Sequence, residues 1–178
     1  MLPLGTVAPA FQLPDAVSGR MISFDDVQGA QGTVVMFICN HCPYVLLVLD
    51  ELLRLAREYQ AKGIGFVAIS ANDVENYPQD APDKMAELAR DRDFPFPYLY
   101  DESQDVAKAY DAACTPEFYV FDRDKKLFYR GRMDEATPGN GKPVTGRDLR
   151  QALDALLTGG APPTDQYPSM GCNIKWKQ

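Results

Sequence analysis

The hydrophobic pattern of the chain changes its period at Pro43. Before that point, residues 33–38 form a continuous β-branched and aromatic run, which predicts a strand buried on both faces. From Val45 to Tyr59, apolar side chains recur at steps of three and four with charged side chains between them, which predicts an amphipathic helix. Pro43 suits the first helical position, because its φ is fixed and its missing N–H costs nothing there. Cys42 is therefore expected at the helix N-terminus, directly after a buried strand.

The remaining pattern predicts a single α/β domain. Short apolar runs at 10–13 and 21–24 flank a turn and predict a β-hairpin. Further along, we expect strands at 64–71, 97–100, 117–122 and 127–130, and helices at 82–92, 103–110 and 147–157. Ser103 is the expected N-cap of the second of these helices. The first two core strands form a parallel right-handed βαβ unit, and the last two strands form an antiparallel hairpin. Residues 158–178 show little regular pattern and are expected to form a tail.

Composition and charge narrow the class of protein. The chain has 178 residues, 46% of them apolar, and a formal net charge of −7. The acidic balance argues against nucleic acid or an anionic membrane as a partner, and no apolar run approaches the ~20 residues of a membrane span. The first residues resemble no secretory signal, so we expect a cytoplasmic protein whose four cysteines are reduced. With one histidine and no nucleotide-binding glycine spacing, we expect no metal and no cofactor.

Cys42 is the candidate nucleophile. The unpartnered amide groups and the dipole of a helix N-terminus stabilise a thiolate, so its pKa should lie below the ordinary value of about 8.5. A protonated His41 would add to this effect. A peroxide converts such a thiolate to a sulfenic acid and a disulfide converts it to a mixed disulfide, so either reaction needs a second thiol. The alternative is that Cys42 is only a small buried residue.

Three other cysteines are candidates for the second thiol. Cys39 is the nearest in the sequence, although a cysteine at a strand end is equally suited to filling the core. Cys114 precedes Thr115 and Pro116, and either packing or a role in the site would explain it. Cys172 lies in the tail, where the alternative to a resolving thiol is an exposed and inert one.

Five segments together resemble one family of redox proteins. They are GTVAPAFQLPD at 5–15, FICNHCPYV at 37–45, ACTPEF at 113–118, PGNGKPVTGRDL at 138–149 and GCNIKWK at 171–177. They are similar to the alkyl hydroperoxide reductase/thiol-specific antioxidant (AhpC/TSA) family, and in particular to a bacterial subgroup described as peroxiredoxin-like. The resemblance covers almost the whole chain. It implies one thioredoxin-like domain over residues 1–178, with a three-layer α/β/α fold, a mixed central sheet and an N-terminal β-hairpin extension.

The resemblance also implies roles for individual residues. Pro116 corresponds to the cis-proline of thioredoxin-like proteins, and its neighbour Thr115 would offer backbone groups to an extended substrate or a thiol. His41 and Pro43 would lie beside the same substrate. The tail around Cys172 resembles the carboxyl-terminal resolving segment of two-cysteine peroxiredoxins.

The sequence departs from the peroxiredoxin pattern at two positions. Cys39 stands where peroxiredoxins carry a threonine three residues before the peroxidatic cysteine. Pro116 takes the place of the peroxidatic arginine, for which Arg130 and Arg132 are candidate substitutes. The resemblance therefore supports thiol redox chemistry more strongly than peroxidase activity.

The resulting hypothesis is a thiol-dependent oxidoreductase of antioxidant, peroxiredoxin-like character that reduces peroxides or protein disulfides. Its expected partners are a thiol reductant such as a thioredoxin-like protein, and a second copy of the chain in a homodimer. One alternative is a zinc- or copper-binding module with Cys39, Cys42 and Cys114 as ligands, and Cys172 or His41 as candidate further ligands. The other is a catalytically silent scaffold, because a fold alone does not define a function.

Overall fold

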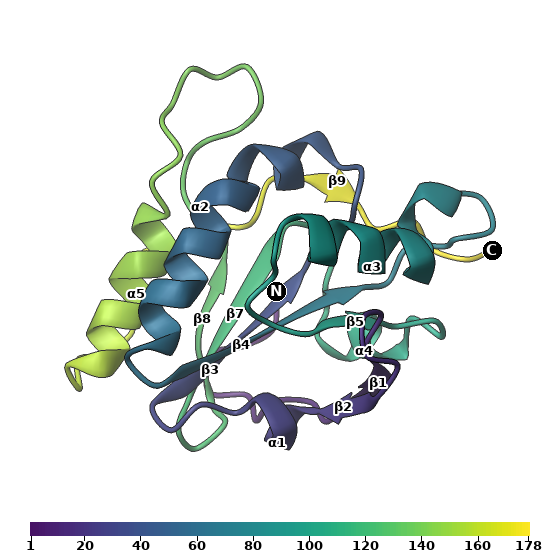
Figure 1. Cartoon of the computed structure of the whole chain (residues 1–178). Coiled ribbons are helices and arrows are strands. Elements are labelled where there is room, and N and C mark those ends of the chain that lie inside the picture. The colour runs from purple at the N-terminus through teal and green to yellow at the C-terminus, as the bar shows by residue number, and fades with distance from the viewer.

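A mixed five-stranded sheet forms the centre of the protein, whose computed structural model describes residues 1–178 (Figure 1). In spatial order the strands are β5 (Tyr98–Tyr100), β4 (Ile64–Ser70), β3 (Gly32–Phe37), β7 (Glu117–Asp122) and β8 (Leu127–Gly131). The first three are parallel, whereas β7 is antiparallel to β3 and β8 is antiparallel to β7. This arrangement confirms the predicted parallel βαβ unit and the predicted hairpin.

Helices cover both faces of the sheet. Side chains of α2 (Pro43–Gln60), α3 (Pro82–Asp91) and α5 (Arg147–Leu157) belong to the hydrophobic cluster on one face, where α2 and α5 lie side by side (Figure 1). The other face packs against α1 (Phe24–Val27), α4 (Asp105–Ala109) and the N-terminal segment. That segment contains the predicted hairpin, formed by β1 (Gln12–Pro14) and β2 (Met21–Ser23). The three layers confirm the predicted fold class.

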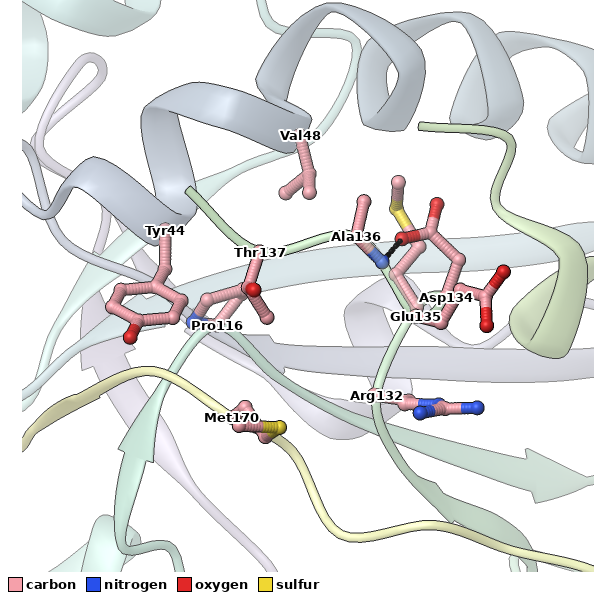
Figure 2. A pocket seen from close by; sticks show the side chains of 10 residues that line it. Tyr44, Val48, Pro116, Arg132, Asp134, Glu135, Ala136, Thr137 and Met170 are labelled. Atoms are coloured by element: carbon pink, nitrogen blue, oxygen red, sulfur yellow. Dashed lines mark hydrogen bonds between the residues drawn. The ribbon is translucent and has the colours of Figure 1, made fainter. Parts of the chain in front are cut away.

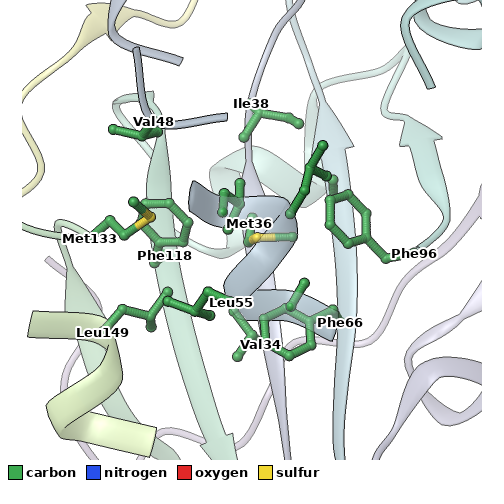
Figure 3. Packing of buried hydrophobic residues seen from close by; sticks show 14 of the residues in the cluster. Val34, Met36, Ile38, Val48, Leu55, Phe66, Phe96, Phe118, Met133 and Leu149 are labelled. Atoms are coloured by element: carbon green, nitrogen blue, oxygen red, sulfur yellow. The ribbon is translucent and has the colours of Figure 1, made fainter. Parts of the chain in front are cut away.

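The buried run at residues 33–38 explains why β3 lies at the centre. Val34 and Met36 point into the cluster beneath α2, while Val35 and Phe37 point into the opposite cluster. All four are completely buried. Because successive side chains of a strand alternate between the faces, only an unbroken apolar run can serve two cores at once. Figure 3 shows the packing on the α2 side.

The expected start of α4 is wrong. Its N-cap is Gln104, which has a φ of 68° and no side-chain capping bond, and not Ser103. The Ser103 hydroxyl accepts only from the amide of Asp105, at 3.2 Å. The buried carboxylate of Asp101 accepts from the next two amides, those of Val106 and Ala107, at 3.5 and 2.8 Å. Asp101 lies outside the usual N-cap position, so the capping pattern of the sequence does not single it out.

The C-terminal tail is more ordered than its sequence pattern predicts. It contains β9 (Cys172–Asn173), which pairs antiparallel with β6 (Cys114–Thr115) and places Cys172 opposite Thr115. Two residues are too few to show a period of two, which is why the sequence does not reveal this strand. A single turn of 3₁₀-helix, η1 (Pro78–Asp80), completes the elements near the site. None of the helices has the length and apolar character needed to cross a membrane.

Candidate active site

Cys42 occupies the N-cap position of α2, with Pro43 as the first helical residue. Its carbonyl accepts the first helical hydrogen bond from the amide of Leu46 at 3.0 Å. The strand–helix junction that the sequence predicts is therefore present. Cys42 is completely buried, however, so nothing reaches its sulfur directly from solvent while the surrounding chain stays in place.

A second sulfur lies directly against Cys42. The Sγ atoms of Cys42 and Cys172 are 2.7 Å apart, although the residues are separated by 130 positions in the sequence. Both cysteines are free thiols, and Cys172 is only partly buried. Of the three candidate second thiols, Cys172 is thus the one whose sulfur contacts Cys42 from the partly exposed side of the site.

Hydrogen bonds to the Cys42 sulfur favour its thiolate. The side chain of Cys39 donates the bond that lowers the pKa of Cys42 most, followed by the thiol of Cys172 and the amide of Val45, while burial opposes them. The same bond, together with burial, raises the pKa of Cys39 well above its ordinary range. Burial and the contact with Cys42 raise the pKa of Cys172 to about 11. The negative charge of the cluster is therefore concentrated on one of three neighbouring sulfurs.

The peptide bond between Thr115 and Pro116 is cis, as predicted. The carbonyl oxygen of Thr115 lies 3.6 Å from the Cys42 sulfur, and the Thr115 hydroxyl lies 3.5 Å from the sulfur of Cys39. The loop before the proline thus faces the predicted nucleophile and its neighbour. This contact supports the predicted position of Thr115 and Pro116 beside the site.

The His41 side chain contacts the buried carboxylate of Asp80, a residue that sequence reasoning missed. Its Nδ1 lies 2.7 Å from Oδ2 of Asp80, and its ring stacks over Tyr77. Asp80 is completely buried on η1 and also accepts bonds from the amide of Asn40 and the side chain of Asn72, both at 2.9 Å. Asp80 therefore holds the loop before Cys42 against the end of β4. A lone acidic residue between two prolines gives no sequence signal for this role.

Cys114 is directed toward the tail backbone. Its sulfur lies 3.7 Å from the carbonyl oxygen of Ser169, and burial raises its pKa to about 12. A thiol with such a high pKa and a hydrogen-bonded position is a poor nucleophile at neutral pH. The structure thus favours a packing role for Cys114.

The two candidate arginines differ in position. Arg130 is bound to the carbonyl of Leu2 and the side chain of Gln166, both at 2.9 Å. Arg132 forms an ion pair with Asp148 at 2.6 Å and lines a pocket next to the cis-proline (Figure 2). The other lining residues are Tyr44, Val48, Pro116, Met133, Asp134, Glu135, Ala136, Thr137 and Met170. Of the two substitutes, only Arg132 lines the pocket that shares Pro116 with the thiol site.

The cysteine ligands of the alternative metal-binding hypothesis are not assembled as one group. The cluster whose ligand atoms all lie within 4.8 Å of one another consists of Cys39, His41 and Asp80. Both oxygens of Asp80 already accept hydrogen bonds, and the pKa of Cys39 is raised rather than lowered. Because metal ligation requires a thiolate and free lone pairs, these residues fit a hydrogen-bonded network better than a soft-metal site.

A thiol at a helix N-terminus, facing a cis-proline on a mixed five-stranded sheet, defines a protein of the thioredoxin fold. Residues 4–130 match the model of the AhpC/TSA family, and the chain belongs to that family. This confirms the resemblance seen in the sequence. Comparison with curated proteins gives no match.

Solved structures share this fold. An uncharacterized conserved protein from Geobacillus kaustophilus is 56% identical, with a TM-score of 0.97 over 99% of this chain and 94% of its own. A hypothetical protein from Sinorhizobium meliloti 1021 is 45% identical, with a TM-score of 0.96 over 99% and 96%. Peroxidoxin BcpB from Mycobacterium tuberculosis shares the fold at 20% identity, with a TM-score of 0.66 over 89% and 98%.

Proposed function

We propose that the protein is a thiol-dependent oxidoreductase whose redox pair is Cys42 and Cys172. The observation that carries this proposal is the 2.7 Å contact between the two sulfurs at the N-terminus of α2. One sulfur is stabilised as a thiolate and the other remains a thiol at neutral pH, which is the division of roles that oxidation to a disulfide requires.

With a peroxide as oxidant, the reaction proceeds in two steps. The Cys42 thiolate attacks one peroxide oxygen, so an S–O bond forms, the O–O bond breaks, and the departing oxygen leaves as water or an alcohol after taking up a proton. The sulfur of Cys172 then attacks the sulfenic acid of Cys42, which forms the disulfide and releases the hydroxyl group with the thiol proton as water. The peroxide is thereby reduced by two electrons and the two thiols are oxidised by two.

An external thiol closes the cycle. Its thiolate attacks the Cys172 sulfur, which is the more accessible of the two, and Cys42 leaves as the stabilised thiolate. A second thiolate then attacks the outer sulfur of this mixed disulfide and frees Cys172. A thioredoxin-like dithiol suits both steps.

A homodimer and a cytoplasmic location remain predictions.

The test is stoichiometric oxidation of the reduced protein by hydrogen peroxide. We expect the wild type and Cys114→Ser to consume peroxide at the same rate, because the Cys114 thiol contacts the Ser169 carbonyl and its raised pKa keeps it protonated. Cys42→Ser should lose rapid consumption. Equal rates in Cys42→Ser and the wild type would remove the proposal and favour a catalytically silent scaffold.

A further inference from the structure

The tail occupies the edge of β6 beside the nucleophile. Backbone pairing of β6 with β9 sets Cys172 opposite Thr115, so the chain delivers a sulfur to Cys42 while its own backbone pairs next to the cis-proline. Gly171 makes this approach possible, because a Cβ there would lie 1.9 Å from the carbonyl oxygen of Thr115. The tail therefore lies as close to this loop as a polypeptide backbone can.

Several contacts beyond β9 hold the tail in place. The Lys175 amide donates to the side-chain oxygen of Asn72 at 2.9 Å, and the Lys175 carbonyl accepts bonds from the amide of Asp73 at 2.8 Å and the side chain of Gln104 at 2.9 Å. Ile174 is buried in the hydrophobic cluster on the far face of the sheet. The tail is thus anchored on both sides of the site and is not a loose end.

A polypeptide disulfide would need the same place. To bring a sulfur to Cys42 in extended conformation, an external chain would have to pair with the free backbone groups of β6, as peptides do when they add a strand to an exposed edge. The tail already uses these groups. We propose that the C-terminal tail is a built-in substrate segment that reserves Cys42 for small oxidants and excludes protein disulfides. This inference rests on the proposed function and specifies its class of substrate.

Small oxidants meet a smaller obstacle. Cys172 is partly exposed, and its side chain can change rotamer without any change in the backbone pairing of β9. On this proposal, that rotation is what admits a small oxidant to the buried Cys42 sulfur. Admitting an external chain requires the β6–β9 pairing itself to break. The discrimination therefore comes from the backbone of the tail and not from the sulfur of Cys172.

Two substitutions release the tail by different means. Gly171→Ala places a methyl group against Thr115, and Ile174→Asp removes the apolar anchor, so both should undock β9 while all four cysteines remain. Cys172→Ser keeps the strand docked and lacks only the sulfur. Gly160→Ala is the control glycine, because the nearest atom to its added Cβ would be 3.3 Å away. Fluorescence of Trp176, the only tryptophan in the chain, reports whether the tail is docked.

The assay compares oxidation of each reduced protein by hydrogen peroxide with its reduction of insulin disulfides under dithiothreitol. We expect the wild type, Gly160→Ala and Cys172→Ser to leave insulin nearly untouched. Both undocked variants should reduce insulin faster than the wild type, by on the order of tenfold. This factor corresponds to the free energy of one or two backbone hydrogen bonds, which the docked tail would otherwise have to break. Their first oxidation by peroxide should not slow.

Two other results have separate meanings. In one result, Trp176 shows a docked tail in the wild type, yet the wild type reduces insulin as fast as the undocked variants. That result would overturn the inference and leave the proposed function standing. In the other result, the wild type reacts no faster than Cys42→Ser with hydrogen peroxide or with insulin disulfides. That result would remove the proposed function and this inference with it.

Discussion

At the scale of single residues, the chemistry depends on three sulfurs with different proton affinities. Side-chain hydrogen bonding with Cys39 and with Cys172 lowers the pKa of Cys42. Cys39 stands where peroxiredoxins carry a threonine, and a thiol, like a hydroxyl, can donate a hydrogen bond. Under the proposed function, Cys39 is a positioning residue that lowers the pKa of Cys42.

Replacing Cys39 should therefore raise the pKa of Cys42. A hydrogen bond to a charged group contributes about 1.5–3 kcal/mol, which corresponds to an increase of about one to two pKa units in Cys39→Ala. The ultraviolet absorbance of the thiolate, followed as a function of pH, measures this shift. Cys114→Ala is the matched control and should leave the titration unchanged. An unaltered midpoint in Cys39→Ala would show that the helix N-terminus and Cys172 set the ionisation of Cys42 without Cys39.

Individual residues also show what the sequence predicts and what it does not. Cys42 could be found because strand, proline and helix are local signals around it. Its contact with Cys172 could not be derived from the pattern, because it depends on the path of the tail across the fold. Asp80 was missed for the same reason, since its partners come from the loop before Cys42 and from the end of β4.

At the scale of elements, long periodic segments are predicted well and short paired ones poorly. The expected bounds of α5 are those observed, and α2 begins at the proline that the sequence indicates. In both helices the apolar stripe faces the sheet, so the pattern reports the packing directly. β9 is stabilised by its pairing with β6 and by the anchors of the tail, which a two-residue pattern does not encode.

The packing of α2 should account for a large part of the stability. Leu49 is completely buried under the helix, and Leu46 on the same helix is 47% exposed. Leu49→Ala should lower the free energy of unfolding by about 2–5 kcal/mol, through lost burial and the cavity it leaves. Leu46→Ala should change it by less than about 0.5 kcal/mol. Urea denaturation of the two reduced variants makes the comparison. Equal losses would mean that the exposed face of α2 is covered in solution.

At the scale of the whole molecule, the proposed redox pair joins the start of α2 to the C-terminal tail. A Cys42–Cys172 disulfide closes a loop between positions 130 apart. In the chain-entropy view, a cross-link over a loop of that size restricts the unfolded chain and stabilises the folded one by about 3–5 kcal/mol. Oxidation should therefore fix the tail in its docked position.

The oxidised protein should accordingly resist urea better than the reduced protein. Two denaturation curves of the wild type, with and without reductant, give the difference in free energy. Cys172→Ser cannot form the bridge and should show no increase on oxidation. A gain of the same size in Cys172→Ser would place the stabilising bond between other cysteines.

The most direct test of the redox pair is mass spectrometry of the protein oxidised with one equivalent of hydrogen peroxide and digested without reduction. We predict one intrachain disulfide, which links the peptide containing Cys42 to the peptide containing Cys172. A bridge between Cys39 and Cys42, or four cysteines without any disulfide, would contradict the account.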